Sequence, residues 1–314
     1  MHDRATPAPF LKWAGGKRQL LPRILDLVPG RIETYYEPFL GGGAVFFALA
    51  ARGVFRRAIL ADANPELIAC YEAVRDDVEA VIRVLRNRGY RNDRDRYYAV
   101  RAMDPGGLPA PERAARIIYL NHCGYNGLYR VNSAGRFNVP FGRYHHPTIC
   151  DANKLRAAAR ALARVELRCG DFEPALAGSR AGDFVYLDPP YVPVSRTASF
   201  TAYAARDFGA ADQERLAAAL RGLGARGIPA LLSNSACAET TRLYRPLKIA
   251  RVQARRAIHS AGGRRGPVGE ILVRSFDYPL AIAAPITRLA GRTGAGDGAG
   301  GRAERARAAS GAKG

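Results

Sequence analysis

The chain has 314 residues, which allows one large domain or two ordinary ones, and 48% of them are hydrophobic, as in an ordinary globular protein. No apolar run approaches the ~20 residues of a membrane span, and the first eight residues lack the apolar core of a signal peptide. The 48 Lys and Arg residues against 28 Asp and Glu give a formal net charge of +20, which favours a polyanionic partner such as nucleic acid.

The cysteine and histidine residues argue against two further classes. The five Cys form no Cys-x-x-Cys pair, which favours reduced thiols and a cytoplasmic location. The five His show no spacing typical of zinc ligands, so we expect no metal site. Arg-rich codon usage is the alternative explanation of the net charge.

The first motif is the segment Phe10–Arg18, which precedes the first expected strand. Its Gly-Gly-Lys resembles a phosphate-binding P-loop, but Leu11 replaces the first glycine and Arg18 replaces the final Ser or Thr. Trp13 and Lys17 could instead cover a cationic cofactor that carries a carboxylate. A core tryptophan is the alternative.

The second motif joins an expected strand over 33–36 to an expected helix over 44–51 through a run of three glycines. Such glycines let the backbone approach a ligand closely. Phe46 stands where G-x-G-x-x-G would need its last glycine, which disfavours NAD and FAD. Asp62 ends the next expected strand about 20 residues later, where an acid binds ribose hydroxyls. These features favour an adenosine cofactor without a diphosphate, such as S-adenosylmethionine, over a plain turn with a capping aspartate.

The pattern of residues from about 72 to 150 predicts a mostly helical insertion. Helical spacing covers 74–85 and, more weakly, 113–121, and residues 121–142 then interleave aromatic, Asn and Arg side chains. Arg and Asn pair bidentately with guanine and adenine edges, and aromatic residues can wedge into base stacks. Residues 113–150 contain five Arg and no acid. A nucleic-acid-reading loop is therefore favoured over a purely structural one.

The third motif, Asp188-Pro189-Pro190-Tyr191, directly follows an expected strand over 183–187. A carboxylate at the carboxyl end of a strand points into the ligand crevice of an open sheet. Asp188 and the Pro189 carbonyl could accept the two hydrogens of a planar exocyclic amine, and Tyr191 could stack on the ring that carries it. An ordinary turn is the alternative.

The remaining elements complete an α/β pattern. Strands are expected over 57–61, 165–168, 230–233 and 271–275, and helices from Asn64-Pro65 and over 212–223. Alternation of this kind predicts a largely parallel sheet. Residues 283–314 are rich in Gly and Ala, and we expect a disordered tail there.

These motifs together resemble the Dam-type (D12 class) DNA adenine-N6 methyltransferases, over roughly residues 8–278. The resemblance rests on motifs that occur in one order: Lys12–Lys17, Glu37–Gly43, Asp62, Tyr125–Gly142, Asp171-Phe172 and Asp188–Tyr191. It implies a Rossmann-like methyltransferase sheet with an inserted, mostly helical target-recognition domain. The catalytic domain would comprise 1–71 and 151–282, and the recognition domain 72–150. The acidic pair that many members carry near the C-terminal end is Gly269-Glu270 here, so the role of Glu270 is open.

The resemblance also implies roles for individual residues. Those implied to bind S-adenosylmethionine are Trp13, Lys17, Phe39, Gly41, Gly43, Asp62, Asp171, Phe172 and Asp188. Those implied to be catalytic are Asp188, Pro189, Pro190 and Tyr191. Those implied to contact DNA are Lys12, Tyr125, Asn126, Leu128, Arg130, Asn132 and Pro140, with Arg130 on a guanine and Leu128 on a thymine methyl.

The implied function is site-specific methylation of adenine N6 in double-stranded DNA, with GATC as the first candidate site. The target base must leave the stack, and one flipped base per turnover requires only a monomer. Cytosine N4, an RNA substrate and a catalytically silent DNA-binding protein are alternatives. Restriction–modification, repair and gene regulation all remain open as its context.

Overall fold

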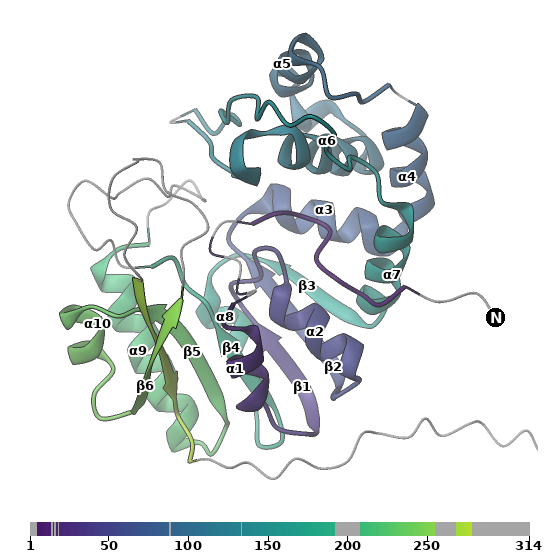
Figure 1. Ribbon diagram of the computed structural model, residues 1–314. Helices are drawn as coiled ribbons and strands as arrows, with labels where there is room; N and C mark the ends of the chain where they lie inside the picture. Colours follow the sequence, from purple (N-terminus) through teal and green to yellow (C-terminus); the bar gives the residue numbers. More distant parts are fainter. Residues whose placement is uncertain are drawn as a thin grey trace, which may run out of the picture.

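The computed structural model describes residues 5–13, 15, 17, 19–87, 89–132, 134–191, 208–254 and 268–277. These residues form one seven-stranded sheet with helices packed against it (Figure 1). The strands are β1 (Ile32–Glu37), β2 (Phe55–Asp62), β3 (Val165–Cys169), β4 (Phe184–Leu187), β5 (Ala230–Ser235), β6 (Lys248–Ala254) and β7 (Val268–Arg274). The α-helices are α1 (Leu21–Asp26), α2 (Ala44–Arg52), α3 (Pro65–Asp76), α4 (Val78–Asn87), α5 (Arg94–Ala102), α6 (Ala110–Cys123), α7 (Ala152–Leu162), α8 (Phe172–Leu176), α9 (Ala210–Ala225) and α10 (Ala238–Leu243). Two short 3₁₀ turns are η1 (Pro105–Gly107) and η2 (Tyr125–Gly127).

The strand order of the sheet is β3-β2-β1-β4-β5-β7-β6. The neighbouring strands β3, β2, β1, β4 and β5 pair in parallel, whereas β7 runs antiparallel to both β5 and β6. The chain runs outward from β1 through β2 to β3 on one side, and from β4 to β5 on the other. The topological switch point therefore lies between β1 and β4, where open α/β sheets bind their ligands.

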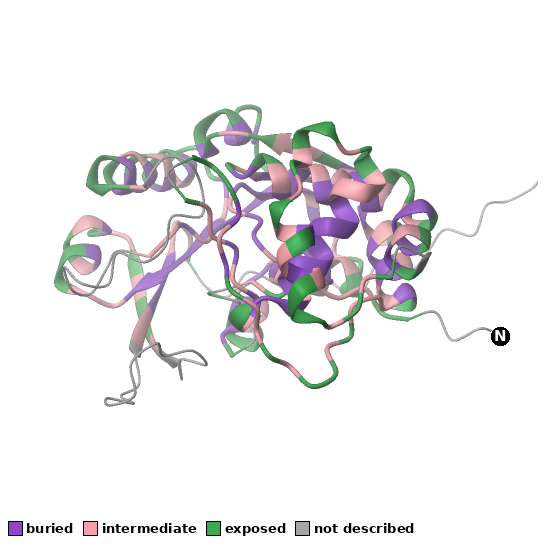
Figure 2. Ribbon diagram, turned by 90° about the horizontal axis from the view of Figure 1, so that it is seen from above, coloured by how far each residue is buried: buried purple, intermediate pink, exposed green. Residues whose placement is uncertain are grey.

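Alternate residues of the strands fill two separate apolar cores. Tyr35 and Tyr186 belong to the larger core, which includes side chains of α1 to α7. Tyr36 and Val185 belong to the second core, which includes α8 and α9. This alternation follows from the period of two in a strand. The central strands are buried on both faces (Figure 2), as expected for parallel strands between helices.

The segment between β2 and β3 consists of helices, which gather on one side of the molecule (Figure 1). Helix α6 lies at its centre, packs against α3, α4 and α5, and is buried along most of its length. Helix α3 also contacts β2 and β3, and the Tyr71 hydroxyl of α3 donates a hydrogen bond to the Gly41 carbonyl at 3.2 Å. The helical segment is therefore joined to the sheet through α3.

The structure confirms the predicted α/β class and each predicted strand, but the sheet is mixed because β6 and β7 are antiparallel. The predicted helix over 74–85 is confirmed as helical but is not continuous: α3 ends at Asp76 and α4 begins at Val78. Asp77 accepts a hydrogen bond from the Ala80 N–H at 3.0 Å, so it caps a new helix. The predicted domain boundary at 71/72 falls inside α3.

Three other observations concern the chain as a whole. The predicted tail, 283–314, lies outside the described residues. Within the part that is described, no helix is long and apolar enough to cross a membrane. The five cysteines are all free thiols.

Candidate active site

The loops that follow β1, β2 and β4 meet at the carboxyl edge of the sheet, next to the switch point. Parallel neighbours end at the same edge, so the sequence motifs after these strands come together there. The Gly turn follows β1, Asp62 ends β2, and Asp188 directly follows β4.

The Gly turn combines an unusual backbone conformation with close packing against an aromatic ring. Gly41 and Gly43 have φ angles of 49° and 67°, a left-handed conformation that side chains disfavour. The ring of Trp13 packs on this turn so closely that a Cβ at Gly41 would lie 2.8 Å from the Trp13 Cδ1. Tyr129 also stacks on that ring, with centroids 5.7 Å apart. The turn therefore needs glycine both for its backbone conformation and for its contact with Trp13.

Asp62 links the Gly turn to the start of α3. Its Oδ2 accepts the Gly41 N–H at 2.9 Å, and its Oδ1 accepts the Asn64 N–H at 3.0 Å. Burial raises the pKa of Asp62 to about 6, although both hydrogen bonds act in the opposite direction. A carboxylate has about four lone-pair sites, so two remain for a ligand.

Glu37, at the end of β1, is a buried acid whose role the sequence did not indicate. Its Oε2 accepts the Tyr35 hydroxyl at 2.9 Å and the Phe46 N–H at 3.1 Å. Burial raises the pKa of Glu37 to about 8. Glu37 thus fixes the first turn of α2 against β1, beneath the Gly turn.

Asp188 lies in a compact polar cluster with Lys17 and Ser233. Its Oδ1 accepts hydrogen bonds from the Lys17 ammonium at 2.8 Å and from the Ser233 hydroxyl at 2.9 Å. The Tyr186 hydroxyl lies 2.9 Å from the Ser233 Oγ. Burial raises the pKa of Asp188, and Lys17 and Ser233 oppose that rise. Oδ2 has no hydrogen-bond partner among the described residues, so one face of the carboxylate is open.

The Tyr191 hydroxyl accepts a hydrogen bond from the same ammonium group. Lys17 Nζ is 2.5 Å from the Tyr191 hydroxyl and 4.3 Å from the centroid of its ring. The hydroxyl of Tyr191 also donates to Glu270 Oε2 at 2.6 Å. The structure therefore brings Lys17, Asp188 and Tyr191 together, although Lys17 was implied to contact only the cofactor.

The two prolines of this motif differ in their carbonyl groups. The Pro190 carbonyl accepts the Gln213 Nε2 at 3.0 Å, and the Gln213 side chain is held by Asn234 and Tyr244. No described residue donates a hydrogen bond to the Pro189 carbonyl. The Pro189 carbonyl is thus the available acceptor beside Asp188.

Phe39 and Phe172 stack on each other with ring centroids 5.6 Å apart, so the turn after β1 packs against α8. Asp171 caps α8 and forms an ion pair with Arg215 at 2.8 Å. The Arg215 guanidinium also lies 4.9 Å from the Phe172 ring centroid. Asp171 therefore already has an ion-pair partner, whereas Asp62 accepts hydrogen bonds from backbone N–H groups.

The loop implied to read DNA begins at the end of α6. The Tyr125 N–H donates to the Pro140 carbonyl at 2.9 Å, and Asn126 adopts a φ of 55°. The Tyr125 side chain is 44% exposed, although large hydrophobic side chains are usually covered. Lys12 lies beside this loop, with its Nζ 4.4 Å from the Tyr144 ring centroid.

Other residues of the loop already have internal partners. Arg130 Nε donates to the Asn138 Oδ1 at 2.7 Å. Asn132 Oδ1 accepts the backbone N–H groups of Ala134 and Arg136, so Asn132 closes a turn. Leu128 is partly buried against the larger core.

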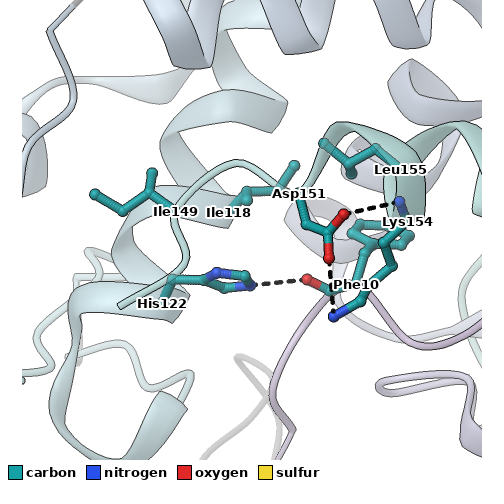
Figure 3. Close-up of a pocket in the computed structure, with 7 residues that line it drawn as sticks. All are labelled: Phe10, Ile118, His122, Ile149, Asp151, Lys154 and Leu155. Atoms are coloured by element: carbon teal, nitrogen blue, oxygen red, sulfur yellow. Dashed lines mark hydrogen bonds and ion pairs between the residues drawn. The ribbon is translucent and has the colours of Figure 1, made fainter. Parts of the chain in front are cut away.

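Figure 3 shows a small, mostly apolar pocket at a different place. It is lined by Phe10, Ile118, His122, Ile149, Asp151, Lys154 and Leu155. His122 Nε2 lies 2.8 Å from the Phe10 carbonyl oxygen across it. None of the site residues implied by the sequence lines this pocket, so it is separate from the residues gathered at the switch point.

Some residues near the site were given no role from the sequence. Glu37, Gln213, Ser233 and Glu270 come from four different elements. Glu37 and Glu270 lie in segments that the family resemblance singled out, and Ser233 had an indicator in the polar run Ser233–Ser235 at the carboxyl end of an apolar strand.

A Gly turn after β1, an acid ending β2 and Asp-Pro-Pro-Tyr after β4, at one edge of an α/β sheet, are the features of a Rossmann-like methyltransferase. The chain belongs to the D12 class N6 adenine-specific DNA methyltransferases, whose family model matches residues 13–258. It is thus an adenine-specific DNA methyltransferase, and its methyl donor is S-adenosylmethionine.

Three relatives illustrate this membership. The type II methyltransferase M1.LlaDCHI of Lactococcus lactis subsp. cremoris is 40% identical, covering 85% of this chain and 95% of the relative. The type II methyltransferase M.MjaIII of Methanocaldococcus jannaschii is 41% identical, covering 85% and 99%. The DNA adenine methylase of Escherichia coli is 39% identical, covering 84% and 93%.

Proposed function

We propose that the protein methylates adenine N6 within GATC sites of duplex DNA, on a base flipped into the crevice at the switch point. The observation that carries this proposal is the state of Asp188, whose Oδ1 is held by Lys17 and Ser233 at 2.8 Å and 2.9 Å while Oδ2 has no hydrogen-bond partner among the described residues. Together with the Pro189 carbonyl, Oδ2 offers the two acceptors that an exocyclic amine on a flat base requires.

The residues around the Gly turn fit S-adenosylmethionine. Asp62 retains lone pairs for ribose hydroxyls, and Gly41 lets the chain pass close to a ligand. We assign the cofactor contacts to residues of this crevice: Trp13, Lys17, Phe39, Gly41, Gly43, Asp62, Asp171, Phe172 and Asp188. The bound cofactor supplies a methyl group activated by its sulfonium charge, so the protein's part is orientation and electrostatics.

The target amine would be held by Asp188 and the Pro189 carbonyl. Adenine N6 is a weak nucleophile because its lone pair is delocalised into the ring. Two acceptors that bond both of its hydrogens favour a more pyramidal, more nucleophilic nitrogen. The Pro190 carbonyl is engaged by Gln213, which leaves Pro189 as the second acceptor. Ser233 fixes Asp188 so that Oδ2 stays open.

Recognition of DNA is assigned to the segment 72–150 together with Lys12. An exposed Tyr125 next to Asn126 fits insertion beside an opened base pair, because aromatic wedges offset unstacking. The proposed contacts to DNA are Lys12, Tyr125, Asn126, Leu128, Arg130, Asn132 and Pro140. One flipped base per turnover needs one active site, so we propose that a monomer acts.

The test uses tritiated S-adenosylmethionine and two duplexes that differ only in one GATC site. We expect label on N6-methyladenine in the duplex that contains GATC, and at least tenfold less label on the duplex that lacks it. Equal label on both duplexes would refute GATC specificity. A hemimethylated or fully methylated GATC duplex serves as a second control, since full methylation should abolish incorporation.

A further inference from the structure

Glu270 reaches the active-site crevice from the antiparallel part of the sheet. In the register of β5 and β7, Glu270 pairs with Ser235, two residues beyond Ser233. Its Oε2 accepts a hydrogen bond from the Tyr191 hydroxyl at 2.6 Å. The family resemblance assigned no role to this acid.

The direction of the hydrogen bonds around Tyr191 is determined by chemistry. An ammonium group can only donate, so the Tyr191 oxygen accepts from Lys17 and its proton must go to Glu270. Burial raises the pKa of Tyr191, which keeps the phenol neutral and its proton in place. The Tyr191 hydroxyl is thus bonded on both sides, to a cation from the N-terminal segment and to an anion from β7.

This double contact fixes the ring as well as the hydroxyl. A tyrosine side chain moves chiefly about two torsions, and a hydrogen bond at its far end restricts both. Bonds to charged groups are the stronger ones, so the anchor at Glu270 is worth more than a neutral contact. Without it, the Tyr191 hydroxyl would keep, among the described residues, only its bond to Lys17.

We propose that Glu270 is a positioning residue that holds the ring of Tyr191 over the target base by accepting its hydroxyl. The inference rests on the proposed roles of Asp188 and Tyr191. It gives the antiparallel β7 a part in the reaction, because β7 supplies the acceptor that keeps the stacking ring in place.

A double-mutant cycle tests this proposal through non-additivity. Single-turnover methylation of a GATC duplex is measured for the wild type, Glu270→Ala, Tyr191→Phe and the double variant. We expect Glu270→Ala to slow transfer about tenfold, as for loss of a charged hydrogen bond, with little change in KM for DNA. In the Tyr191→Phe background, Glu270→Ala should have almost no further effect. Glu270→Gln, which keeps an acceptor, should recover most of the rate.

The controls separate this inference from folding and from the proposed function. Glu239→Ala removes an exposed acid just after β5 and should leave the rate unchanged. If Glu270→Ala lowers the temperature of thermal unfolding, the methylation rate of Glu270→Gln is compared with that of the wild type instead. The positioning role then requires that Glu270→Gln keep most of the wild-type rate. The positioning role would be overturned if the rate losses of the two single variants multiplied in the double variant. A wild-type rate for Glu270→Ala would overturn it as well. Transfer that survives in Asp188→Ala would instead refute the proposed site.

Discussion

The side chain of Asn121 forms hydrogen bonds with both backbone groups of Lys12. Its Oδ1 accepts the Lys12 N–H at 2.7 Å, and its Nδ2 donates to the Lys12 carbonyl at 2.6 Å. The same Nδ2 donates to the Gly127 carbonyl at 3.0 Å. One buried amide at the end of α6 therefore ties the N-terminal segment to the turn that carries Tyr125 and Asn126.

Replacing Asn121 with alanine should destabilise the protein. The change leaves the backbone groups of Lys12 and Gly127 without their partner, at a cost of about 1–3 kcal/mol in the free energy of unfolding. Urea denaturation followed by circular dichroism measures this. Asn153→Ala, at an exposed position of α7, is the matched control and should change stability by no more than about 0.5 kcal/mol. Equal effects of the two substitutions would show that the contacts of Asn121 carry no net stability.

The buried acid Glu37 should make stability depend on pH. Because burial raises its folded-state pKa from 4.5 to about 8, the folded chain keeps a proton that the unfolded chain releases. The stabilising contribution is complete below the unfolded pKa and is lost as pH rises through about 8. Glu37→Gln, which mimics the protonated acid, does not titrate. Between pH 4.5 and about 8, the free energy of unfolding of the wild type should therefore fall by a few kcal/mol relative to that of Glu37→Gln.

Urea unfolding of both proteins at several pH values tests this difference. Titration of other groups, including Asp62, cancels to first order when the two proteins are compared at each pH. A stability difference between them that does not change with pH would mean that Glu37 ionises normally in the folded state.

Arg130 offers a test of sequence discrimination. Its guanidinium is held by Asn138, at 2.7 Å from Nε to Oδ1, which would orient it for one base edge. Arg130→Ala should reduce discrimination at one guanine of the site by about 1–3 kcal/mol. The measurement is kcat/KM on duplexes with single substitutions in GATC. Arg136→Ala, at an exposed position of the same loop, should lower all rates alike or not at all. A uniform loss for Arg130→Ala would indicate a phosphate contact instead.

The sequence predicted the parts of the site that follow directly from strands. Asp62 ends one apolar run and Asp188 directly follows another, both bounded as strands are, and parallel neighbours end at one edge. The sequence also predicted the Gly turn, because three glycines between a strand and a helix leave few other conformations. These features are local, so they could be read without the fold.

The parts that were missed depend on contacts between distant segments. Asn121 and Lys12 are 109 residues apart, and Tyr191 and Glu270 are 79 residues apart. Neither pair shows a pattern in the sequence. Helix α5, Arg94–Ala102, was missed because its charged and Tyr-rich sequence hides its apolar spacing. The capping of α4 by Asp77 went unnoticed because continuous apolar spacing masks a helix break.

Asp188 is proposed to accept the target amine at the transfer step. The most direct measurement is the single-turnover methylation rate of Asp188→Ala on a GATC duplex, with duplex affinity measured in parallel. We expect the rate to fall by about a thousandfold or more while affinity for DNA changes only a few-fold, since DNA binding is assigned to 72–150 and Lys12. Ser233→Ala, which frees the Asp188 carboxylate without removing it, should lower the rate far less. Methylation by Asp188→Ala at a rate near that of the wild type would show that Asp188 does not hold the target amine.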